Sequence, residues 1–335
     1  MEAECEPLGK SQIQREPDLK TCRISIVIPT RNRLEKLRRA LASIEQQTFR
    51  DYEVWLVDDG STDGTRGFID PGQLARTYPN IPSIHTLLNE RSCGAAAARN
   101  QALARAQGEL IAFLDDDDVW FPNYLQQQLM QLDGHPKAAA CSARHVEFDA
   151  GGSSHRPDTL PLFEGGDPLI HLLTDSFVHT MSIFMCRRAA FDSIGMFDEK
   201  LSIVHDWDWY ARLLLSGNSI LTPAGPALAG HEVPGGLVER HRAWYAEEQS
   251  VLDKIFTDNT QYSGKQRQVR AHRALVFARI GLSRRDHVFA LRRLMEAFSG
   301  APLHSLRAVA LRLLRNCRSA ISREPSSHTR SPLSP

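Results

Sequence analysis

Four consecutive aspartates at positions 115–118 are the residues of this chain whose type and spacing most directly suggest chemistry. They follow the apolar run at residues 110–114, which predicts a buried strand because it is short and continuous. Adjacent carboxylates repel one another strongly unless positive charge lies among them. A solvated acidic turn is one explanation, and a divalent-cation site is the other. The second is favoured because open α/β sheets bind ligands at the carboxyl ends of their strands.

A second pair of carboxylates, Asp58 and Asp59, follows another short apolar run at residues 54–57. Strand and helix patterns alternate over residues 24–114, which predicts a mostly parallel sheet with helices on both faces. Parallel strands share a direction, so both groups of carboxylates are expected at the same edge. Two such groups at one edge indicate a site more strongly than either does alone.

Hydrophobic periodicity predicts the elements that must position these acids. Strands are expected at residues 24–28 (ending at Pro29), 54–57, 84–88, 110–114, 138–143 and 181–186. Helices are expected at residues 34–44, at about 65–76, at 95–106 with Gly108 as C-cap, and from Asp206 to a stop at Gly217.

The loop after the first strand, residues 29–33, offers a hydroxyl, an amide and two guanidinium groups. Thr30 or Asn32 could cap the following helix, or the loop could contact a ligand, and both explanations stay open. The chain has no G-x-G-x-x-G after the first strand and no G-x-x-x-x-G-K-[ST] motif. Their absence argues against a dehydrogenase and a P-loop enzyme.

Composition indicates an ordinary globular protein with two differently charged parts. Of 335 residues, 42% are hydrophobic and 24% charged, and the formal net charge is zero. Residues 261–335 carry 15 Lys and Arg against three Asp and Glu, a net +12, so residues 1–260 carry −12. The acidic N-terminal residues have no apolar core and do not predict a signal peptide. We therefore expect a cytoplasmic protein.

Several stretches, taken in order, resemble the nucleotide-sugar-dependent glycosyltransferases of family 2. They are I-S-I-V-I-P-T-R-N-R (24–33), V-D-D-G-S-T-D-G-T (57–65), A-A-A-R-N-Q-A-L (96–103) and G-E-L-I-A-F-L-D-D-D-D-V-W-F-P (108–122). The resemblance resumes at G-M-F-D-E (195–199) and H-D-W-D-W (205–209), where the family usually reads G-G-F-D-E and E-D-x-D. It implies the GT-A fold, an α/β architecture with a mostly parallel, Rossmann-like sheet flanked by helices.

Carried over residue by residue, the resemblance implies a role for each site residue. Asp206 is implied as the catalytic base. Asp115 and Asp117 are implied as the D-x-D pair that holds Mg²⁺ or Mn²⁺, with Asp117 the direct metal ligand. Asp116, between them, would contact sugar or water. The residues implied to bind the nucleotide sugar are Pro29, Thr30, Arg33, Asp58, Asp59, Arg99, Asp115 and Asp116.

Some of these residues have structural explanations as well. Asp206 at a helix start would make an excellent N-cap. Arg99 could be a surface residue of an Ala-rich helix. His205 replaces the usual glutamate, which could mean altered acceptor contacts or a weaker case for Asp206 as the base. His231 could approach the metal or diphosphate, or be an ordinary loop histidine.

We expect four parts in the chain: a flexible lead-in (1–21), the GT-A domain (22–256), a basic helical extension (257–321) and a disordered tail (322–335). Within the GT-A domain, residues 149–168 predict a flexible loop that closes over the donor or is a tolerated insertion. The helix expected at 303–321 is basic and amphipathic. It could lie on the inner face of an anionic membrane, or pack on the catalytic domain with a solvated arginine face. No aromatic platform or motif indicates nucleic-acid binding.

These observations and the resemblance together predict a metal-dependent glycosyltransferase, and the resemblance implies that it is an inverting one. It would move a sugar from a nucleotide-diphosphate sugar to a carbohydrate or lipid-linked acceptor hydroxyl, in polysaccharide, cell-surface glycan or glycolipid synthesis. One alternative is a sugar-phosphate nucleotidyltransferase, although the loop at residues 29–33 lacks the glycine-rich, basic character usual in that class. The other is a catalytically silent member that binds carbohydrate or a partner, which the departure at His205 leaves open.

Overall fold

The computed structural model describes residues 22–148, 156–157, 165–178, 180–222, 225–232 and 240–301. The chain divides into two compact units, Met1–Ile255 and Phe256–Pro335. The expected lead-in, the helix at 303–321, the tail and most of the loop at 149–168 lie outside the described residues.

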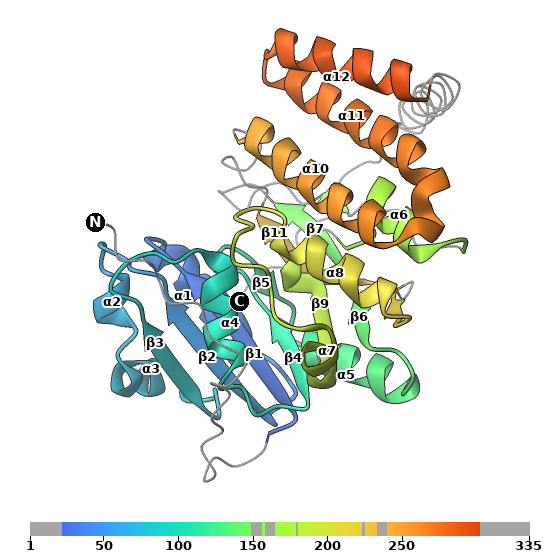
Figure 1. The fold of residues 1–335 in the computed structure, drawn as a ribbon. Coiled ribbons are helices and arrows are strands. Elements are labelled where there is room, and N and C mark those ends of the chain that lie inside the picture. The colour runs from blue at the N-terminus through green and yellow to red at the C-terminus, as the bar shows by residue number, and fades with distance from the viewer. Residues whose placement is uncertain are drawn as a thin grey trace, which may run out of the picture. The chain divides into compact units, whose positions relative to one another are not determined.

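A seven-stranded sheet forms the centre of the first unit, in the order β10-β6-β9-β4-β1-β2-β3 (Figure 1). Only β9 runs antiparallel to its neighbours in this sheet, which confirms the mostly parallel arrangement. Its strands are β1 (Ile24–Thr30), β2 (Tyr52–Asp58), β3 (Ile84–Leu88), β4 (Leu110–Phe113), β6 (Ala140–Ser142), β9 (Phe184–Arg187) and β10 (Ile220–Leu221). A smaller sheet, in the order β5-β11-β7-β8, contains β5 (Val119–Trp120), β11 (Ala227–Glu232), β7 (Arg144–Phe148) and β8 (Arg156–Pro157).

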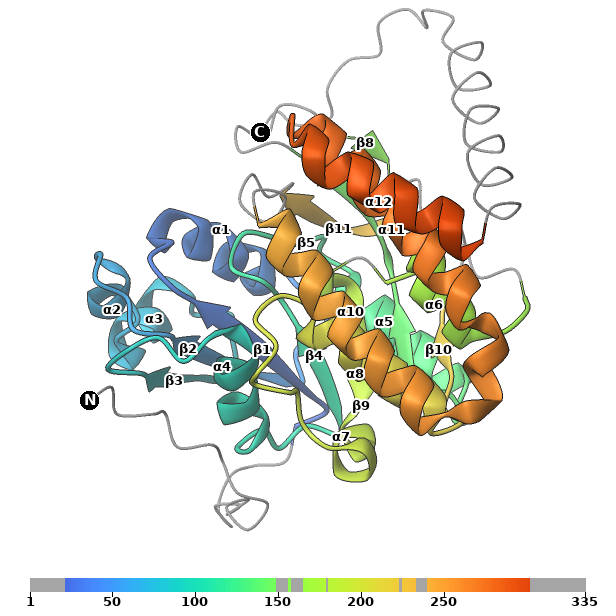
Figure 2. The ribbon, with the colours of Figure 1, turned by 45° about the horizontal axis from the view of Figure 1, so that its top comes forward.

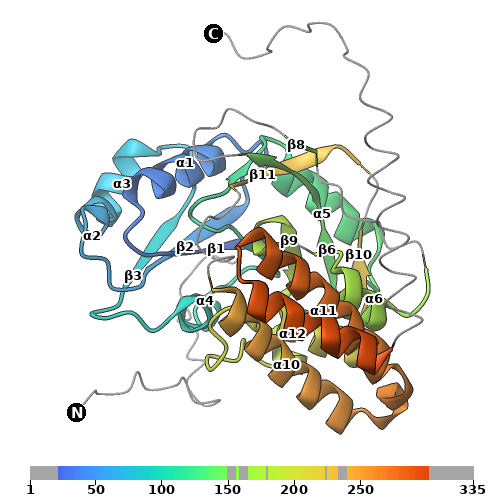
Figure 3. The ribbon, with the colours of Figure 1, turned by 90° about the horizontal axis from the view of Figure 1, so that it is seen from above.

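Helices cover both faces of the large sheet, with α1 (Leu34–Glu45) and α3 (Pro71–Thr77) on one face and α4 (Ala95–Leu103) on the other (Figure 3). The chain moves one way along the sheet from β1 to β3 and returns from β3 to β4. Right-handed crossovers in opposite directions place their helices on opposite faces. Alternate residues of β1, Ile24, Ile26 and Ile28, then pack into the core with Leu37 and Leu41 of α1.

The other helices of the first unit are α2 (Thr65–Phe68), α5 (Tyr124–Gly134), α6 (Pro168–Asp175), α7 (Arg188–Ile194), α8 (His205–Leu215) and most of α10 (His241–Asp258), whose last residues, from Phe256, fall in the second unit. A 3₁₀ turn at Met181–Ile183 precedes β9, so only the second half of the strand expected at 181–186 is extended. Helix α10 lies next to α8 (Figure 2).

The first strand continues through Pro29 to Thr30, so the expected end at Pro29 is wrong. The carbonyl of Val27 accepts a hydrogen bond from the Leu114 amide on the β4 side. The nitrogen of Pro29, two residues on, faces that same side, where β4 has already ended at Phe113. The missing N–H of proline therefore leaves no ladder bond unmade.

The single helix expected at about residues 65–76 is two short helices, α2 and α3. The break falls at Asp70 and Pro71. The Asp70 side chain caps α3 by accepting from the Gln73 amide at 2.8 Å, and Pro71 occupies the first turn.

Gly108 does not cap α4, as was expected, because that helix ends at Leu103 with Ala104 as its C-cap. Gly108 instead lies where the chain entering β4 passes the backbone of β1. A Cβ at this position would lie 2.4 Å from the Ser25 nitrogen, so only glycine fits. The Gly108 amide donates to Ser25 Oγ at 2.8 Å, which ties the start of β4 to β1.

The second unit contains two long helices, α11 (Gln266–Ser283) and α12 (His287–Gly300), which pack against each other. At their contact a Cβ on Gly281 would lie 3.0 Å from the Phe289 ring, so glycine permits the close approach. Helix α12 buries Phe289, Ala290 and Ala297, whereas a second apolar stripe stays exposed: Val288, Leu291, Met295 and Phe298. In the part of the chain that the structure describes, no helix is both long and apolar enough to cross a membrane.

Candidate active site

The carboxyl ends of β1, β2 and β4 bring the predicted polar residues to one edge of the sheet. Thr30 pairs with Asp58 in the β1–β2 register, and the aspartate cluster, residues 115–118, follows β4 directly. Within this cluster, Asp116 is 4% exposed and Asp118 is 0% exposed. The cluster is therefore not a solvated surface turn, and its charges need partners inside the protein.

The end of β1 and the start of α1 supply a hydroxyl and two cations to Asp116 and Asp117, in the middle of the aspartate cluster. Thr30 Oγ1 donates to Asp116 Oδ2 at 2.7 Å, and Arg33 Nη1 donates to Asp116 Oδ1 at 2.9 Å. The same Arg33 nitrogen donates to Asp117 Oδ2 at 2.8 Å, and Lys36 Nζ lies 3.7 Å from that oxygen. A single arginine therefore bridges two of the four carboxylates.

The turn that carries Arg33 is held by Asn32, which adopts a left-handed backbone conformation with φ 53°. Its Oδ1 accepts from the Thr62 amide at 2.7 Å, and its own amide donates to Ser61 Oγ at 2.9 Å. Arg33 occupies the N-cap position of α1, which has no side-chain cap bond. The explanation that Thr30 or Asn32 caps this helix is therefore wrong.

The last member of the cluster, Asp118, is paired with His231 of β11. His231 Nδ1 lies 2.9 Å from Asp118 Oδ1, and Thr180 Oγ1 donates to Asp118 Oδ2 at 3.3 Å. Burial alone would lower the pKa of His231, but the hydrogen bond and charge of Asp118 outweigh it and raise that pKa. His231 is thus a strand residue at the site rather than a loop histidine.

Asp117 has Arg33 and Lys36 beside it, but these cations do not balance burial and the neighbouring carboxylates. Burial, followed by the charges of Asp118 and Asp115, raises the pKa of Asp117 to about 7, against the opposing charge of Arg33. Carboxylate oxygens are the ligands that Mg²⁺ and Mn²⁺ prefer. Among the described residues no group of three or more His, Cys, Asp or Glu is arranged to hold a metal. A cation here would be completed by water and substrate oxygens, the usual arrangement for Mg²⁺, so these residues fit it.

Arg99 connects the first aspartate of the cluster to α8. It is 4% exposed, so it is not a surface residue of α4. Its Nη2 donates a short hydrogen bond to Asp115 Oδ1, and its Nη1 lies 2.7 Å from His205 Nε2. The amide of Asp115 donates to Ser182 Oγ at 3.0 Å, which fixes the backbone at the same point.

Asp206 lies inside the first turn of α8 and is not its N-cap, because the helix begins at His205 and Val204 holds the cap position. Asp206 Oδ1 accepts from the Trp207 amide at 2.7 Å. Burial raises the pKa of Asp206 to about 6, although that hydrogen bond and the charge of Arg99 oppose the shift. Asp206 is therefore within electrostatic range of the Arg99 group and has a proton affinity suited to a general base near neutral pH.

The loop leading into Asp206 is held by Glu247 of α10. The Glu247 carboxylate accepts from the backbone amides of Ser202, Ile203 and Val204, the shortest at 2.8 Å. Partial burial would raise the pKa of Glu247, but these bonds and the Ser202 hydroxyl lower it below its ordinary value. Glu247 therefore fixes the chain immediately before α8.

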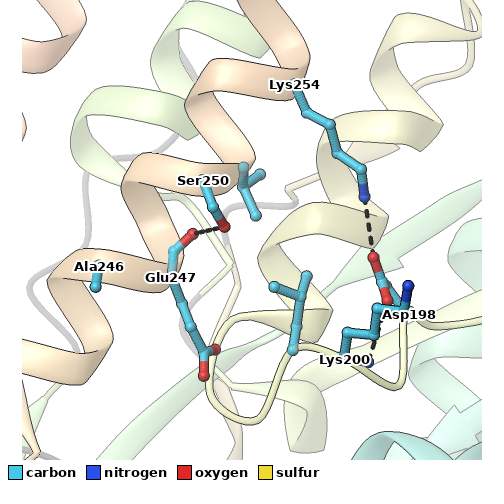
Figure 4. Close-up of a pocket in the computed structure, with 8 residues that line it drawn as sticks. Asp198, Lys200, Ala246, Glu247, Ser250 and Lys254 are labelled. Carbon is cyan, nitrogen blue, oxygen red and sulfur yellow. Dashed lines mark hydrogen bonds and ion pairs between the residues drawn. The ribbon is translucent and has the colours of Figure 1, made fainter.

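A pocket lies beside this contact, between residues 198–201 and α10 (Figure 4). Lys254 Nζ reaches across it to Asp198 Oδ2 at 2.9 Å. Its lining residues are Asp198, Lys200, Leu201, Ala246, Glu247, Ser250, Val251 and Lys254. None of the predicted site residues lines this pocket. We therefore interpret it as a space beside the loop that Glu247 holds before α8, and not as the active site.

The carboxylates after β2 hold loops in place. Asp58, at the end of β2, is fully buried and accepts from the Ser61 amide at 3.2 Å. Burial would raise the pKa of Asp59, but the hydrogen bonds it accepts outweigh burial and lower that pKa. Its donors, at 2.6 to 3.1 Å, are Asn89 Nδ2, Ser92 Oγ and the amides of Cys93 and Gly94. Both acids shape the edge beside Pro29, and their contact with a nucleotide stays a prediction.

Some residues at this edge carried little or no sequence signal. Lys36 could have been found, because it lies three positions after Arg33 in the same first helical turn. Ser182 and Glu247 reach the site only through packing, and no spacing in the sequence marks them. His205 was noticed as a departure from a motif, but its contact with Arg99 was not predicted.

Comparison with known proteins identifies the family. Residues 25–195, more than half of the chain, match the model described as Glycosyl transferase family 2. This chain belongs to glycosyltransferase family 2. The resemblance read from the motifs is thereby confirmed.

Relatives and solved structures agree with this family and with the GT-A fold. A protein named as a glycosyl transferase of colanic acid biosynthesis, WcaA of Escherichia coli K12, is 42% identical over 195 residues, covering 57% of this chain and 66% of WcaA. WfgD of Escherichia coli, named UDP-Glc:alpha-D-GlcNAc-diphosphoundecaprenol beta-1,3-glucosyltransferase, is 37% identical over 109 residues, 32% of this chain and 40% of WfgD. The chain thus spans less than two thirds of either relative.

Among solved structures, the mannosyltransferase PcManGT of Pyrobaculum calidifontis, in complex with GDP-Man and Mn²⁺, is similar with a TM-score of 0.59. It is 19% identical, and the match covers 91% of this chain and 85% of PcManGT. At this identity the likeness establishes the fold, and it confirms the predicted GT-A architecture.

The Glu247 contact predicts a pH-dependent loss of stability. Because the folded-state pKa of Glu247 is lowered, its contribution is present above its unfolded pKa of about 4.3 and is lost as the pH falls through the folded pKa. Glu247→Ala should therefore reduce the free energy of unfolding at pH 7 by about 1 to 2 kcal/mol, as loss of a helix cap does. Urea denaturation followed by tryptophan fluorescence measures this, and the difference from wild type should hold down to about pH 4.3 and shrink below it.

Glu90→Ala is the matched control, because Glu90 is 86% exposed and pairs only at the surface with Arg66. Such pairs contribute about 1 kcal/mol or less. Equal losses for the two variants, or a Glu247→Ala loss that does not change with pH, would contradict the role of Glu247.

Proposed function

We propose that this protein is a metal-dependent, inverting glycosyltransferase that moves a sugar from a nucleotide-diphosphate sugar to an acceptor hydroxyl. The observation that carries the proposal is the convergence of the aspartate cluster, buried Arg99 and Asp206 at one edge of the sheet. Family membership supports sugar transfer. Inversion rests on the family resemblance and not on the spacing of any residues.

Asp206 is the proposed base. With a pKa of about 6, its carboxyl is mostly ionised at neutral pH yet basic enough to accept a proton from a reacting hydroxyl. The acceptor oxygen attacks the anomeric carbon from the face opposite the nucleotide while its proton moves to Asp206. The bond from the anomeric carbon to the diphosphate oxygen breaks, and its electron pair leaves with the nucleoside diphosphate.

Charge on the leaving diphosphate needs positive groups at the same edge. Arg99 is proposed to donate to its oxygens through the planar guanidinium, and Arg33 is proposed to lie close to the nucleotide. Asp117, with Asp115, would hold Mg²⁺ or Mn²⁺, which when bound acts as a Lewis acid for the leaving group. The Mn²⁺ named with PcManGT supports a cation in a protein of this fold.

The remaining roles at the nucleotide sugar stay as the resemblance implies them. Asp59 is proposed to hydrogen-bond the base, with Asp58 beside it, and Asp116 to contact the sugar or water. Pro29 and Thr30 are proposed to border the nucleotide where β1 ends. Because Asp59 accepts from the loop at residues 89–94, a base bound to Asp59 would lie beside that loop.

The names of relatives support a role in cell-surface polysaccharide or glycolipid synthesis, and we propose that this chain acts in the cytoplasm. WcaA is named for colanic acid biosynthesis and WfgD for a diphosphoundecaprenol-linked acceptor. We propose an acceptor of the same class, a carbohydrate or a lipid-linked glycan.

An acceptor of the lipid-linked kind lies in a membrane, and α12 has a surface that fits an anionic membrane. Val288, Leu291, Met295 and Phe298 form one exposed stripe with 38 to 62% of each residue accessible. Residues 261–335 carry a net +12, which complements anionic headgroups. We propose peripheral contact through this stripe.

Removing the proposed metal ligand should separate cation binding from folding. For wild type we expect MnCl₂ to be required for UDP or GDP to raise the melting temperature, and for transfer activity in a panel of sugar nucleotides. Asp117→Asn should lose the Mn²⁺-dependent shift and reduce kcat at least about 100-fold. The control is Asp192→Asn on α7, an exposed carboxylate outside the site. Normal Mn²⁺-dependent transfer by Asp117→Asn would overturn the metal assignment.

Substituting the proposed base should affect turnover and leave donor binding intact. Asp206→Asn should lower kcat by about 100- to 10,000-fold, the usual contribution of a general base, with unchanged affinity for UDP or GDP. In the wild type, kcat/KM should rise with pH through about 6, because Asp206 acts only when deprotonated. Loss of nucleotide binding in Asp206→Asn, or a pH profile without this acid limb, would show that Asp206 is structural.

Membrane contact can be tested with vesicles and two matched methionines. Met295 on α12 is 57% exposed and Met130 on α5 is 56% exposed. Cosedimentation should be stronger with phosphatidylcholine/phosphatidylglycerol vesicles than with phosphatidylcholine alone. Met295→Glu should weaken that binding about tenfold or more, since a buried methionine contributes about 1.5 to 3 kcal/mol, and Met130→Glu should not. Equal effects, or no preference for anionic vesicles, would refute the contact.

A further inference from the structure

The contact between Arg99 and His205 joins the aspartate cluster to the helix that carries Asp206. The two residues are 106 positions apart, and each is buried, with 4% and 6% of the residue exposed. A buried guanidinium needs partners for its charge and its N–H groups. Arg99 finds one on each side, Asp115 at Nη2 and His205 at Nη1.

The geometry fixes the protonation of His205. A guanidinium nitrogen can only donate, so His205 Nε2, 2.7 Å from Arg99 Nη1, must accept. The imidazole is then neutral, with its proton on Nδ1. Burial, and then the charge of Arg99, lower the pKa of His205 to about 3, which is consistent with a neutral ring at any working pH.

A neutral partner has an electrostatic consequence for Arg99. The motif that residues 205–209 resemble usually has glutamate at position 205, and a glutamate there would place a second carboxylate on the guanidinium. With His205, Arg99 is held on two sides but neutralised by Asp115 alone. Its Nε and the His205 Nδ1 are buried without a hydrogen-bond partner among the described residues.

We propose that His205 is a positioning residue, a neutral hydrogen-bond acceptor that fixes the Arg99 guanidinium against Asp115 and adds no second carboxylate that would repel the donor diphosphate. The inference rests on the proposed function, since the diphosphate belongs to a nucleotide-sugar donor. It goes further by assigning a role to the residue that departs from the family motif.

Packing is the competing explanation, because the His205 ring also meets Phe197 edge-on, with 5.7 Å between ring centroids. Two substitutions separate the roles. His205→Leu fills the position with a side chain of similar size and removes the Nε2 acceptor. His205→Gln loses the aromatic contact but can place an amide oxygen near the position of Nε2.

The readouts are binding of UDP and GDP in the presence of MnCl₂, by calorimetry, and kcat/KM with whichever sugar nucleotide the wild type turns over. His205→Leu should weaken both by about 10- to 100-fold, the range expected for losing a charge-assisted hydrogen bond. His205→Gln should stay within about threefold of wild type. A leucine variant equal to wild type, or a glutamine variant as impaired as leucine, would overturn the proposal.

A second measurement on the wild-type protein decides the contact without activity or variants. With ¹⁵N-histidine labelling, His205 Nε2 should be unprotonated and Nδ1 protonated from pH 5 to pH 8, with a coupling across the hydrogen bond to Arg99. An imidazolium, or a proton on Nε2, would overturn the proposal even if every variant failed to fold. If the wild type binds neither nucleotide with MnCl₂, the proposed function fails, and this spectrum still decides whether His205 accepts from Arg99.

Discussion

The whole edge of the sheet depends on one electrostatic constraint, the repulsion among four adjacent carboxylates at the end of a buried strand. These acids cannot reach water freely, because they are attached to the buried strand β4 and moving them would pull its apolar side chains out of the core. Positive or polar partners must therefore come to them, and they come from three separate elements. Arg33 and Lys36 come from the start of α1, Arg99 from α4, and the imidazole of His231, which pairs with Asp118, from β11.

This arrangement links stability to the chemistry proposed for the site. Protein cations satisfy the aspartate cluster only in part, because the pKa of Asp117 still rises to about 7. A carboxylate so placed gains from any further positive charge, and a divalent cation held by Asp117 would supply it. The positive charge of Arg99 also acts on Asp206, where it opposes the rise in pKa that burial causes. The leaving-group end and the base end of the proposed reaction thus share one buried arginine.

Much of the fold could be predicted because strands and carboxylates leave local signals. Short apolar runs located β1 to β4, and the acids that follow them could be placed at one edge from strand direction alone. Boundaries were less predictable where local chemistry competes, as at Pro29, which stays extended because the strand on one side of it has ended. Gly108 was misread as a cap since its reason, close approach to β1, depends on tertiary packing.

In the candidate site, too, local signals were predictable and contacts made by tertiary packing were not. Motif resemblance indicated the residue types, including Arg99 and Asp206, but did not predict which side chains meet. The Arg99–His205 contact and the Glu247 bonds to the chain before α8 join segments far apart in sequence. Such contacts follow from how elements pack and not from the spacing of residues within any of them. The structure therefore keeps the acids that the sequence indicated, and adds the hydrogen bonds that hold their segments in place.

The most direct test of this account is anomalous diffraction from crystals of the full chain grown with MnCl₂ and UDP or GDP. We predict a manganese peak bonded to the Asp117 carboxylate and to the diphosphate, with Arg33 Nη1 withdrawn from Asp117. A nucleotide bound at this edge with no manganese beside the aspartate cluster, and with Arg33 still on Asp117, would contradict the account.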